Sequence, residues 1–183
     1  MQVEFDGSRV DCCELVQTKE MSEVEDHSFE LIGKDFDEFE VGSKHSIAYV
    51  VEVAGKSMQP DFEPVFERTF HNYVNCIEGV MHTGQRDMIR LRISKDTFNA
   101  GFRAKDLAEV LYARIKSEFE AVVDKCQVKI YTNDEDCTRI RHEVAIPAFN
   151  HRDERIGSLT DETVDVYYSC IMCQAFSPRH VCV

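Results

Sequence analysis

Three cysteines near the end of the sequence, Cys170, Cys173 and Cys182, have the spacing of metal ligands. A Cys-x-x-Cys pair can turn two thiolates toward one metal centre, and the eight residues that follow can loop back to a third. Thiolates are soft ligands that select zinc, copper or iron–sulfur clusters. A tetrahedral or four-iron site usually takes a fourth cysteine, and none follows Cys182. Spacing alone therefore leaves two readings open: a metal site, or a Cys-x-x-Cys pair with an unrelated third cysteine.

The other five cysteines are scattered and show no ligand spacing. In a chain without export signals, this distribution argues against a disulfide framework and for buried thiols. Cys76 and Cys126 lie in or beside apolar segments, so both are predicted to be small buried hydrophobic residues.

Arginines alternate with apolar residues in the segment "DMIRLRIS", where Arg90 and Arg92 separate Ile89, Leu91 and Ile93. In a strand this alternation places the arginines on one face and the apolar side chains on the other. The segment "CQVKIYT" repeats the pattern with a lysine. The basic face has two readings: a surface for a ligand or another domain, or arginines paired with local acids. The second is favoured.

Other motifs give no support to common enzyme classes. "GKS" at residues 55–57 resembles part of a P-loop, but Val50 stands where that loop needs a glycine. "HTGQRD" at 82–87 enters the amino end of a predicted strand, whereas ligand sites in open parallel sheets lie beyond the carboxyl ends. A helix stop with an Arg–Asp pair is the favoured role of that segment. The sequence has no dinucleotide fingerprint and no nucleophile turn of serine hydrolases.

The charge balance limits the partners. The net charge is −13, of which −10 falls within residues 1–40. A nucleic-acid partner is not expected, because such proteins neutralise phosphates with a basic surface. No segment has the roughly 20 apolar residues of a membrane helix, and residues 1–11 do not resemble a signal peptide. We therefore expect a soluble cytoplasmic protein that does not bind membranes.

Hydrophobic periodicity predicts the elements that would position these residues. Short strands are predicted at 3–6, 12–17, 28–33 and 46–55, and later strands at 87–94 and 126–132. Helices are predicted at 61–84, 103–124 and 134–145, the last ending before Pro147. The expected fold class is α/β, bordering on α+β. It is a two-layer sandwich with a small, mostly parallel sheet, antiparallel strands at the N-terminus and helices mainly on one face.

Near residue 157 the sequence changes from a charged segment to the start of a new helix, which predicts a boundary between two domains. Residues 150–157 read as a charged connector, and residues 158–162 read as a new helix start with Ser158 or Thr160 as its cap. Residues 1–157 are therefore predicted to form one α/β domain, and residues 158–183 the incomplete start of another.

Several longer sequence segments resemble those of a known protein family. "FHNYVNCIEGVMHTGQRDMIRLRIS" and "TDETVDVYYSCIMCQAFSPRHVCV" resemble the carbon monoxide dehydrogenase/acetyl-CoA synthase family, specifically its acetyl-CoA synthase subunit, the beta subunit of the archaeal decarbonylase/synthase complex. "VEVAG", "GFRAKDLAEVLYA" and "CQVKIYT" extend the likeness through essentially the whole chain. The string Cys-x-x-Cys-Gln-x-Phe-x-Pro-x-His-Val-Cys is its most specific part.

The resemblance implies a function and a set of residues. The family joins carbon monoxide, a corrinoid-bound methyl group and coenzyme A at the A-cluster, a 4Fe-4S cluster bridged to nickel. Cys170, Cys173 and Cys182 match its cluster cysteines, and Phe176 matches a pocket residue beside the proximal metal. The first domain corresponds to the family's coenzyme-A-side middle domain, which gives the basic residues a use, because arginine pairs well with phosphates. The candidates for coenzyme A are Arg86, Arg90, Arg92 and Arg103.

The resemblance also implies partners, and the chain differs from the family at several positions. The partners are the carbon monoxide dehydrogenase subunit and the corrinoid iron–sulfur protein, with ferredoxin as a further candidate. Relatives often carry tryptophan where this chain has Arg90. The fourth cluster cysteine and the Cys-Gly-Cys of the distal nickel are absent from the 183 residues, so we expect these residues alone to be inactive. The alternatives are a non-catalytic module that binds coenzyme A or a partner protein, with empty or zinc-bound cysteines, and a small electron carrier.

Overall fold

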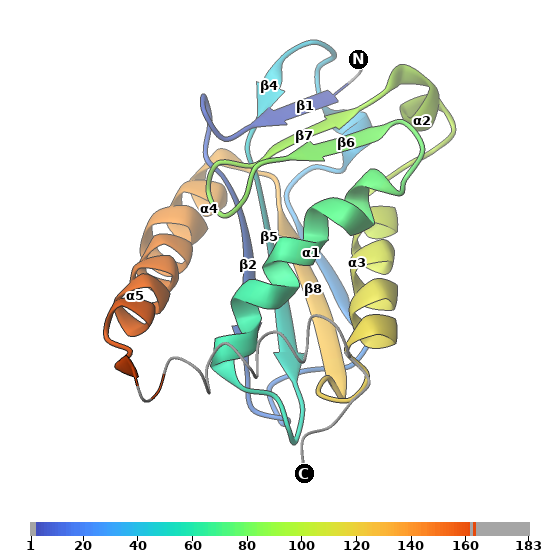
Figure 1. The fold of residues 1–183 in the computed structure, drawn as a ribbon. Coiled ribbons are helices and arrows are strands. Elements are labelled where there is room, and N and C mark those ends of the chain that lie inside the picture. Colours follow the sequence, from blue (N-terminus) through green and yellow to red (C-terminus); the bar gives the residue numbers. More distant parts are fainter. Residues whose placement is uncertain (1–2, 162, 164–183) are drawn as a thin grey trace.

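The computed structural model describes residues 3–161 and 163, and within them the strands form two sheets of four (Figure 1). The first sheet has the strand order β4-β1-β7-β6, and in Figure 1 it lies across the top of the second, whose order is β2-β5-β8-β3. The strands are β1 (Val3–Asp6), β2 (Cys12–Thr18), β3 (Phe29–Ile32), β4 (Lys44–His45), β5 (Ile47–Ala54), β6 (Val80–Thr83), β7 (Arg90–Ile93) and β8 (Lys125–Tyr131). The longer helices are α1 (Glu63–Asn75), α3 (Ala104–Glu118) and α5 (Ile146–Gly157), and the shorter ones are α2 (Lys95–Asn99) and α4 (Asp134–Arg139).

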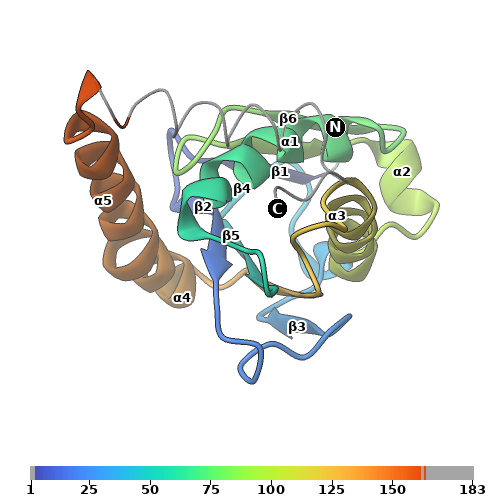
Figure 2. The ribbon, with the colours of Figure 1, turned by 60° about the horizontal axis from the view of Figure 1, so that its bottom comes forward.

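The predicted α/β class is confirmed, with helices α1 and α3 together on one face of the second sheet (Figure 2). α1 buries Phe66, Phe70 and Val74 against this face, and α3 buries Leu107 and Leu111. These residues recur every three to four positions, which is the spacing of one helix face. They form the main core with the inner side chains of both sheets.

The connectivity differs from the predicted mostly parallel sheet. β5 pairs in parallel with β2 but antiparallel with β8, and β7 lies in the other sheet. The N-terminal strands are not uniformly antiparallel either: β1 pairs in parallel with β4 and antiparallel with β7. The rule that makes strand–helix–strand units parallel applies to strands of one sheet, and here the chain changes sheets between its helices.

The change of sheet starts inside the segment predicted as one helix, 61–84. α1 ends at Asn75, and β6 follows, paired antiparallel with β7. Gly79 and Gly84 both have positive φ, at 74° and 85°, a conformation that favours glycine and that no helix continues through. Val80 and Met81 fit the helical spacing, so the apolar pattern alone did not reveal this hairpin.

The last helical stretch covers the opposite face of β2 and β5 and is longer than predicted. A π-helical turn, Ile140–Ala145, joins α4 directly to α5, and the helix runs past Pro147. Pro147 is the second residue of α5 and directly follows the π-helical turn, where the regular α-helical hydrogen-bond pattern is already interrupted. Residues 150–157 are therefore helix and not a connector. A smaller core forms here from Cys13, Leu15, Ala48, Val50, Cys137, Ile140, Ala145 and Phe149.

Two further predictions concern membrane helices and the domain boundary. Within residues 3–161 and 163, no helix has a stretch long and apolar enough to cross a bilayer. The predicted second domain, 158–183, lies almost entirely outside the described residues, so the domain boundary stays a prediction.

Candidate functional site

The predicted cluster residues Cys170, Cys173 and Cys182, and the pocket residue Phe176, lie outside the described residues. Among residues 3–161 and 163, no group of three or more His, Cys, Asp or Glu side chains is placed to hold a metal ion. Of the predicted site residues, the structure therefore describes only the arginines predicted to bind coenzyme A. The structure places these four arginines in different environments.

Arg90 and Arg92 lie together on the outer face of the first sheet, where they contact acids of β1. Arg90 Nη2 lies 3.1 and 3.2 Å from the two carboxylate oxygens of Asp6. Arg92 donates from Nε and Nη2 to Glu4 Oε1, at 3.1 and 3.0 Å. Lys44 of β4 joins them, with Nζ 2.8 Å from Asp6 and 3.1 Å from Glu4. The favoured reading, arginines paired with local acids, is confirmed for both residues.

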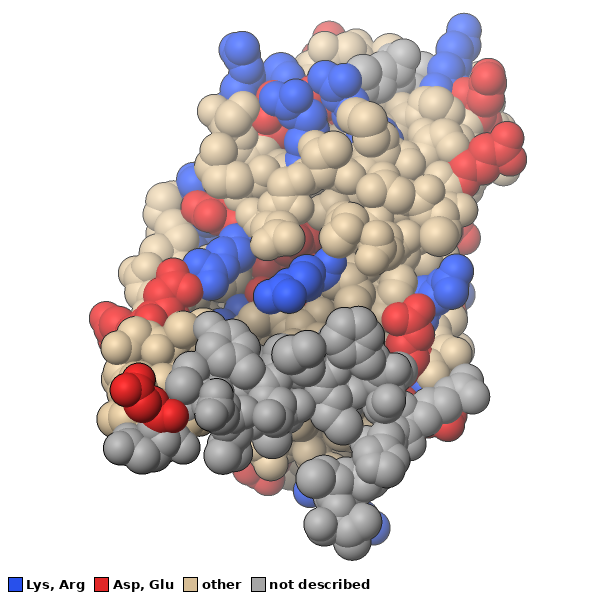
Figure 3. Space-filling view, viewed as in Figure 1, with Lys and Arg blue, Asp and Glu red and all other residues tan. Residues whose placement is uncertain are grey.

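Burial separates the two signs of charge on this face. The side chain of Asp6 is 2% exposed and that of Glu4 is 17% exposed, whereas Lys44, Arg90 and Arg92 are each between 31% and 39% exposed. Hydrogen bonds from Lys44 and Ser8 hold the pKa of Asp6 well below its usual range. Asp6 is therefore charged at neutral pH and anchors the cations above it. Lysine and arginine side chains gather over the first sheet at the top of Figure 3.

Arg86 lies elsewhere and is held by structural contacts. It occupies the turn between β6 and β7 with a φ of 58°, and its carbonyl accepts a hydrogen bond from Glu14 N. Its guanidinium donates to both carboxylate oxygens of Asp153 at 2.7 and 2.8 Å and lies 5.2 Å from the ring centre of Phe149. Arg86 thus ties this turn to α5. The predicted helix stop with an Arg–Asp pair is wrong: the segment is a turn between two strands, where Arg86 pairs with Asp153 and Asp87 pairs with Arg141.

Arg103 lies at the N-terminus of α3 and has a third set of partners. Nη2 is 3.1 Å from Asp37, Nη1 donates to the carbonyl of Phe102, and the guanidinium lies 5.7 Å from the ring centre of Phe98. The structure brings Arg90 and Arg92 together and leaves Arg86 and Arg103 in separate environments.

A buried polar cluster of Glu14, Tyr49 and His82 joins the two sheets. All three side chains are buried. The hydroxyl of Tyr49 donates to Glu14 Oε2, and His82 Nε2 lies 2.8 Å from the same oxygen and 2.9 Å from the hydroxyl. Burial raises the pKa of Tyr49 well above its ordinary value. Glu14 within the apolar strand 12–18 was the one signal in the sequence, since a charge there needs a partner.

A second polar set covers the open edge of β2. It consists of the buried Glu67 and Arg152 and the partly buried Glu63, and we call these three residues the edge clamp. Glu67 Oε1 accepts from Val16 N at 2.8 Å and Glu63 Oε1 from Thr18 N at 2.7 Å. The two glutamates are four residues apart on α1, and one helical turn nearly matches the two-residue repeat of a strand. The carboxylates thus accept from the strand N–H groups where a neighbouring strand would do so.

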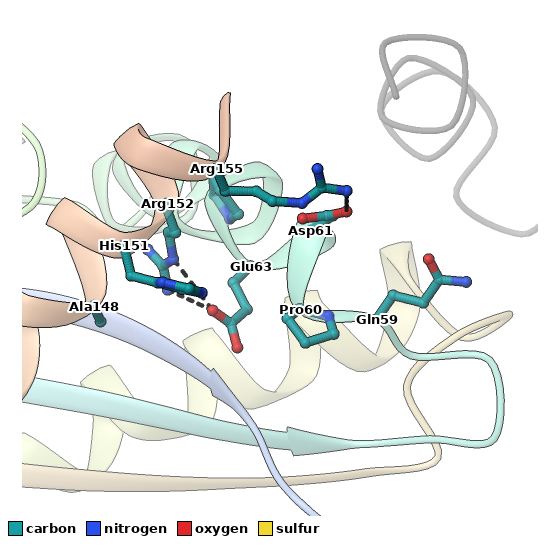
Figure 4. A pocket seen from close by; sticks show the side chains of 9 residues that line it. Gln59, Pro60, Asp61, Glu63, Ala148, His151, Arg152 and Arg155 are labelled. Carbon is teal, nitrogen blue, oxygen red and sulfur yellow. Dashed lines mark hydrogen bonds and ion pairs between the residues drawn. The ribbon is translucent and has the colours of Figure 1, made fainter. Parts of the chain in front are cut away.

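Arg152 of α5 completes the edge clamp, and Figure 4 shows its contact with Glu63. Its Nη1 donates to Glu67 at 2.7 and 2.8 Å, and its Nη2 donates to Glu63 and to the carbonyl of Val16, both at 2.8 Å. Arg152 is only 8% exposed, although it lies in the segment predicted as a solvated connector. Beside it is a cavity of about 380 Å³ between the start of α1 and α5, lined by Gln59, Pro60, Asp61, Glu63, Pro64, Ala148, His151, Arg152 and Arg155.

The thiols of the described residues divide into one exposed and four buried groups, which gives a first prediction. Cys76 is exposed, so its predicted burial is wrong, because α1 ends there and turns it outward. Burial raises the pKa of Cys12, Cys126 and Cys137 to about 12, from an ordinary 9, which leaves about a thousandfold less reactive thiolate. Cys13 is buried as well, and its pKa is also raised.

We expect iodoacetamide at pH 8 to alkylate Cys76 in the folded protein and the four buried cysteines only in denaturant, as peptide mass mapping would record residue by residue. Labelling of Cys126 in the native state at the rate of Cys76 would contradict this assignment.

The comparisons with known proteins cover the whole chain. The family model described as CO dehydrogenase/acetyl-CoA synthase complex beta subunit matches residues 1–137, and a second model, which describes the C-terminal part of the ACS/CODH beta subunit, matches residues 149–183. The second match includes Cys170, Cys173 and Cys182. It also includes Arg152 and Asp153, so the edge clamp and the Arg86 pair connect the two matched regions.

Individual relatives agree with the family models. The carbon monoxide dehydrogenase/acetyl-CoA synthase subunit alpha of Moorella thermoacetica is 47% identical over 183 residues, which is 100% of this chain and 25% of that protein. The acetyl-CoA decarbonylase/synthase complex subunit beta 2 of Methanocaldococcus jannaschii is 44% identical over all of this chain and 38% of its own length. The beta subunit of Methanopyrus kandleri is 39% identical, over 39% of its length. The chain thus spans between a quarter and two-fifths of these relatives, and it belongs to the CO dehydrogenase/acetyl-CoA synthase complex beta subunit family.

Proposed function

We propose that the chain is part of a CO-methylating acetyl-CoA synthase, which assembles acetyl-CoA from carbon monoxide, a corrinoid-bound methyl group and coenzyme A. The observation that carries this proposal is the family match at residues 149–183, because that region holds the cysteine string. Identity of 36–47% over the full chain to proteins named for acetyl-CoA synthesis or decarbonylation supports it.

Cys170, Cys173 and Cys182 are the proposed ligands of the 4Fe-4S part of a nickel-containing A-cluster. Three thiolates suit this group because soft sulfur ligands favour iron–sulfur and nickel centres over hard cations. When bound, the cluster supplies an electron-rich metal that accepts a methyl group and carbon monoxide. Phe176, between the second and third cysteines, is the proposed wall of the metal pocket, where its ring would limit access. Because a four-iron cluster takes four ligands, we expect the 183 residues alone not to turn over.

Coenzyme A is the proposed ligand on the side of the first domain. Its diphosphate and ribose phosphate call for cations that donate several hydrogen bonds, as arginine does. Arg90 and Arg92 are both about one-third exposed beside the buried Asp6 and the partly buried Glu4, which supports a role for these two arginines. Arg86 and Arg103 remain candidates with weaker support, since each lies apart from the other candidate arginines.

The proposed partners follow from membership of a complex. They are the carbon monoxide dehydrogenase subunit, which would supply carbon monoxide, the corrinoid iron–sulfur protein, which would supply the methyl group, and ferredoxin as an electron donor. A cytoplasmic location is proposed with them.

The test of the cluster ligands is anaerobic reconstitution with iron, sulfide and nickel, followed by metal analysis and an absorption spectrum. We expect iron and sulfide to bind, with the broad absorption of an iron–sulfur cluster, and we expect Cys170→Ser or Cys173→Ser to lose most of both. Cys76→Ser is the matched control, because Cys76 is an exposed cysteine that lies outside the cysteine string, and it should bind as the unaltered chain does.

Zinc alone, or no metal, in the reconstituted chain would favour the alternative function, a non-catalytic module that binds coenzyme A or a partner protein. Acetyl-CoA formation by the isolated 183 residues with nickel would contradict the expected lack of turnover.

A further inference from the structure

The outer face of the first sheet carries a lysine that the spacing of the arginines did not suggest. The strand register aligns Lys44, Glu4, Arg92 and Met81 in one row across β4, β1, β7 and β6. Strands lie about 4.8 Å apart, so Lys44 and Arg92 stand on either side of Glu4 in neighbouring strands. The lysine is 38 residues from Asp6 and 48 from Arg92 along the chain, and only the sheet brings them together.

The adjacent row continues the same arrangement. It aligns Asp6, Arg90 and Thr83 across β1, β7 and β6. Arg9 follows closely in the chain, with Nε 4.0 Å from Asp6 and a side chain that is 70% exposed. Four cations therefore surround two carboxylates, which leaves this face positive in a chain whose net charge is −13.

The cations have hydrogen-bond donors that their contacts with the acids do not use and that a ligand could accept from. A guanidinium has five N–H donors, and the contacts of Arg92 with Glu4 use only Nε and Nη2. Arg90 reaches Asp6 through Nη2, and its Nε lies 3.9 Å from Glu4 Oε1, so its Nη1 has no contact with either acid. Lys44, Arg90 and Arg92 are each about one-third exposed, so a ligand can reach them from solvent. The acids pre-organise the cations, which lowers the entropy lost when an anion binds.

We propose that Lys44 binds the phosphate groups of coenzyme A together with Arg90 and Arg92, and that Glu4 and Asp6 are positioning residues that hold these three cations in place. This inference rests on the proposed function, since it takes coenzyme A as the ligand. Exposed Met81, in the row of Arg92, and exposed Met88, two residues before Arg90, offer apolar surface beside the phosphates for the adenine. Arg86 and Arg103 are not part of this site because they lie apart from this face, Arg86 in the turn between β6 and β7 against α5 and Arg103 at the start of α3.

The experiment is titration calorimetry of the full 183-residue chain with coenzyme A, at low and at physiological salt. We expect Lys44→Gln to weaken binding about tenfold or more, as loss of a charge-assisted hydrogen bond does, and Lys44→Arg to restore most of it. Arg90→Gln and Arg92→Gln should weaken it to a similar extent. Lys105→Gln removes the same charge from an exposed site on α3 and should leave binding unchanged.

Pantetheine, which lacks the phosphates, is the second probe and separates lost contacts from a lost fold. The unaltered chain should bind it at least tenfold more weakly than coenzyme A, and Lys44→Gln should not weaken it further. Unchanged coenzyme A binding by Lys44→Gln, or weakening only in Arg86→Gln and Arg103→Gln, would overturn the inference and leave the proposed function standing. No binding of coenzyme A to the unaltered chain would reject its proposed site on this domain, and the inference with it.

Discussion

Replacement of Arg152 by methionine is expected to lower the free energy of unfolding at pH 8, where Glu67 is ionised, by about 3–5 kcal/mol. Arg152 donates to both glutamates of the edge clamp, the buried Glu67 and the partly buried Glu63, and to the carbonyl of Val16. Removing one partner of a buried ion pair leaves the other charge without compensation in a medium of low dielectric, and that penalty dominates the cost. Methionine preserves most of the side-chain length, so lost packing contributes little.

Arg155→Met is the matched control, because Arg155 lies one turn further along α5. Its side chain is 49% exposed and its Nη2 is 3.7 Å from Asp61, a contact that water and salt screen. We expect a change within about 0.5 kcal/mol for this variant. Urea unfolding followed by circular dichroism measures both. A loss below about 1 kcal/mol for Arg152→Met would mean that the edge clamp is solvated in solution.

The two glutamates cannot be exchanged for apolar residues as readily as a simple ion pair can. Replacing all members of a buried charged set by hydrophobic residues is often neutral. In the edge clamp, however, Glu63 and Glu67 also accept from the N–H groups of Thr18 and Val16. An apolar side chain at either position would leave a strand N–H buried without an acceptor, which costs roughly 1–3 kcal/mol. The charges are therefore tied to the strand edge that they cover.

Local patterns predicted most elements of this fold, because apolar spacing reports which face of an element is buried. The predicted strands at 12–17 and 46–55 and the predicted helix at 103–124 correspond to β2, β5 and α3. The helix predicted at 61–84 contained β6, because Val80 and Met81 continue the helical spacing by coincidence. α1 ends at Asn75, and glycines with positive φ lie on either side of β6, at 79 and 84, but single glycines are weak signals in a sequence.

The candidate site could not be predicted in full, because strand pairing and packing bring together residues that lie far apart in the sequence. The face shared by Arg90 and Arg92 followed from their alternation, but Lys44 became part of it only through the pairing of β4 with β1. Arg152 lies 136 residues from Val16 and 85 from Glu67, and no local pattern marks it as buried. Its neighbours along the chain are mostly polar, so residues 150–157 resembled a connector. The cysteine ligands and Phe176 stay predictions, since they lie outside the described residues.

The stability of the protein is expected to fall as pH rises from about 4.5 to about 7, through the deprotonation of Glu67. Burial raises the pKa of this carboxyl from an ordinary 4.5 to about 7, with Arg152 and Val16 N–H acting in the opposite direction. The negative charge of Glu14 raises it further. The folded protein therefore binds this proton more tightly than the unfolded chain does, which makes the carboxyl a source of stability at low pH.

The sign and size of the effect follow from linkage. The contribution of Glu67 is fully present below its unfolded pKa of about 4.5, and it is lost as pH rises through the folded pKa of about 7. Each unit of difference is worth about 1.4 kcal/mol, so the whole contribution is about 3 kcal/mol. Urea unfolding at half-unit steps from pH 4.5 to 8 measures it as the difference between the unaltered chain and Glu67→Gln, in which the titrating group is gone.

Other groups titrate in the same pH range. The test is therefore the difference in unfolding free energy between the unaltered chain and Glu67→Gln at each pH, and not the pH curve of the unaltered chain alone. Glu135→Gln, at an exposed position of α4, is the control and should follow the unaltered chain at every pH. We expect the curve for Glu67→Gln to lack the fall of about 3 kcal/mol that the unaltered chain shows. If the unaltered chain instead gains stability over Glu67→Gln as pH rises, Glu67 is ionised in the folded protein throughout, with Arg152 as a full counter-charge. In that case the edge clamp would stabilise the fold as an ion pair at neutral pH and not by holding a proton.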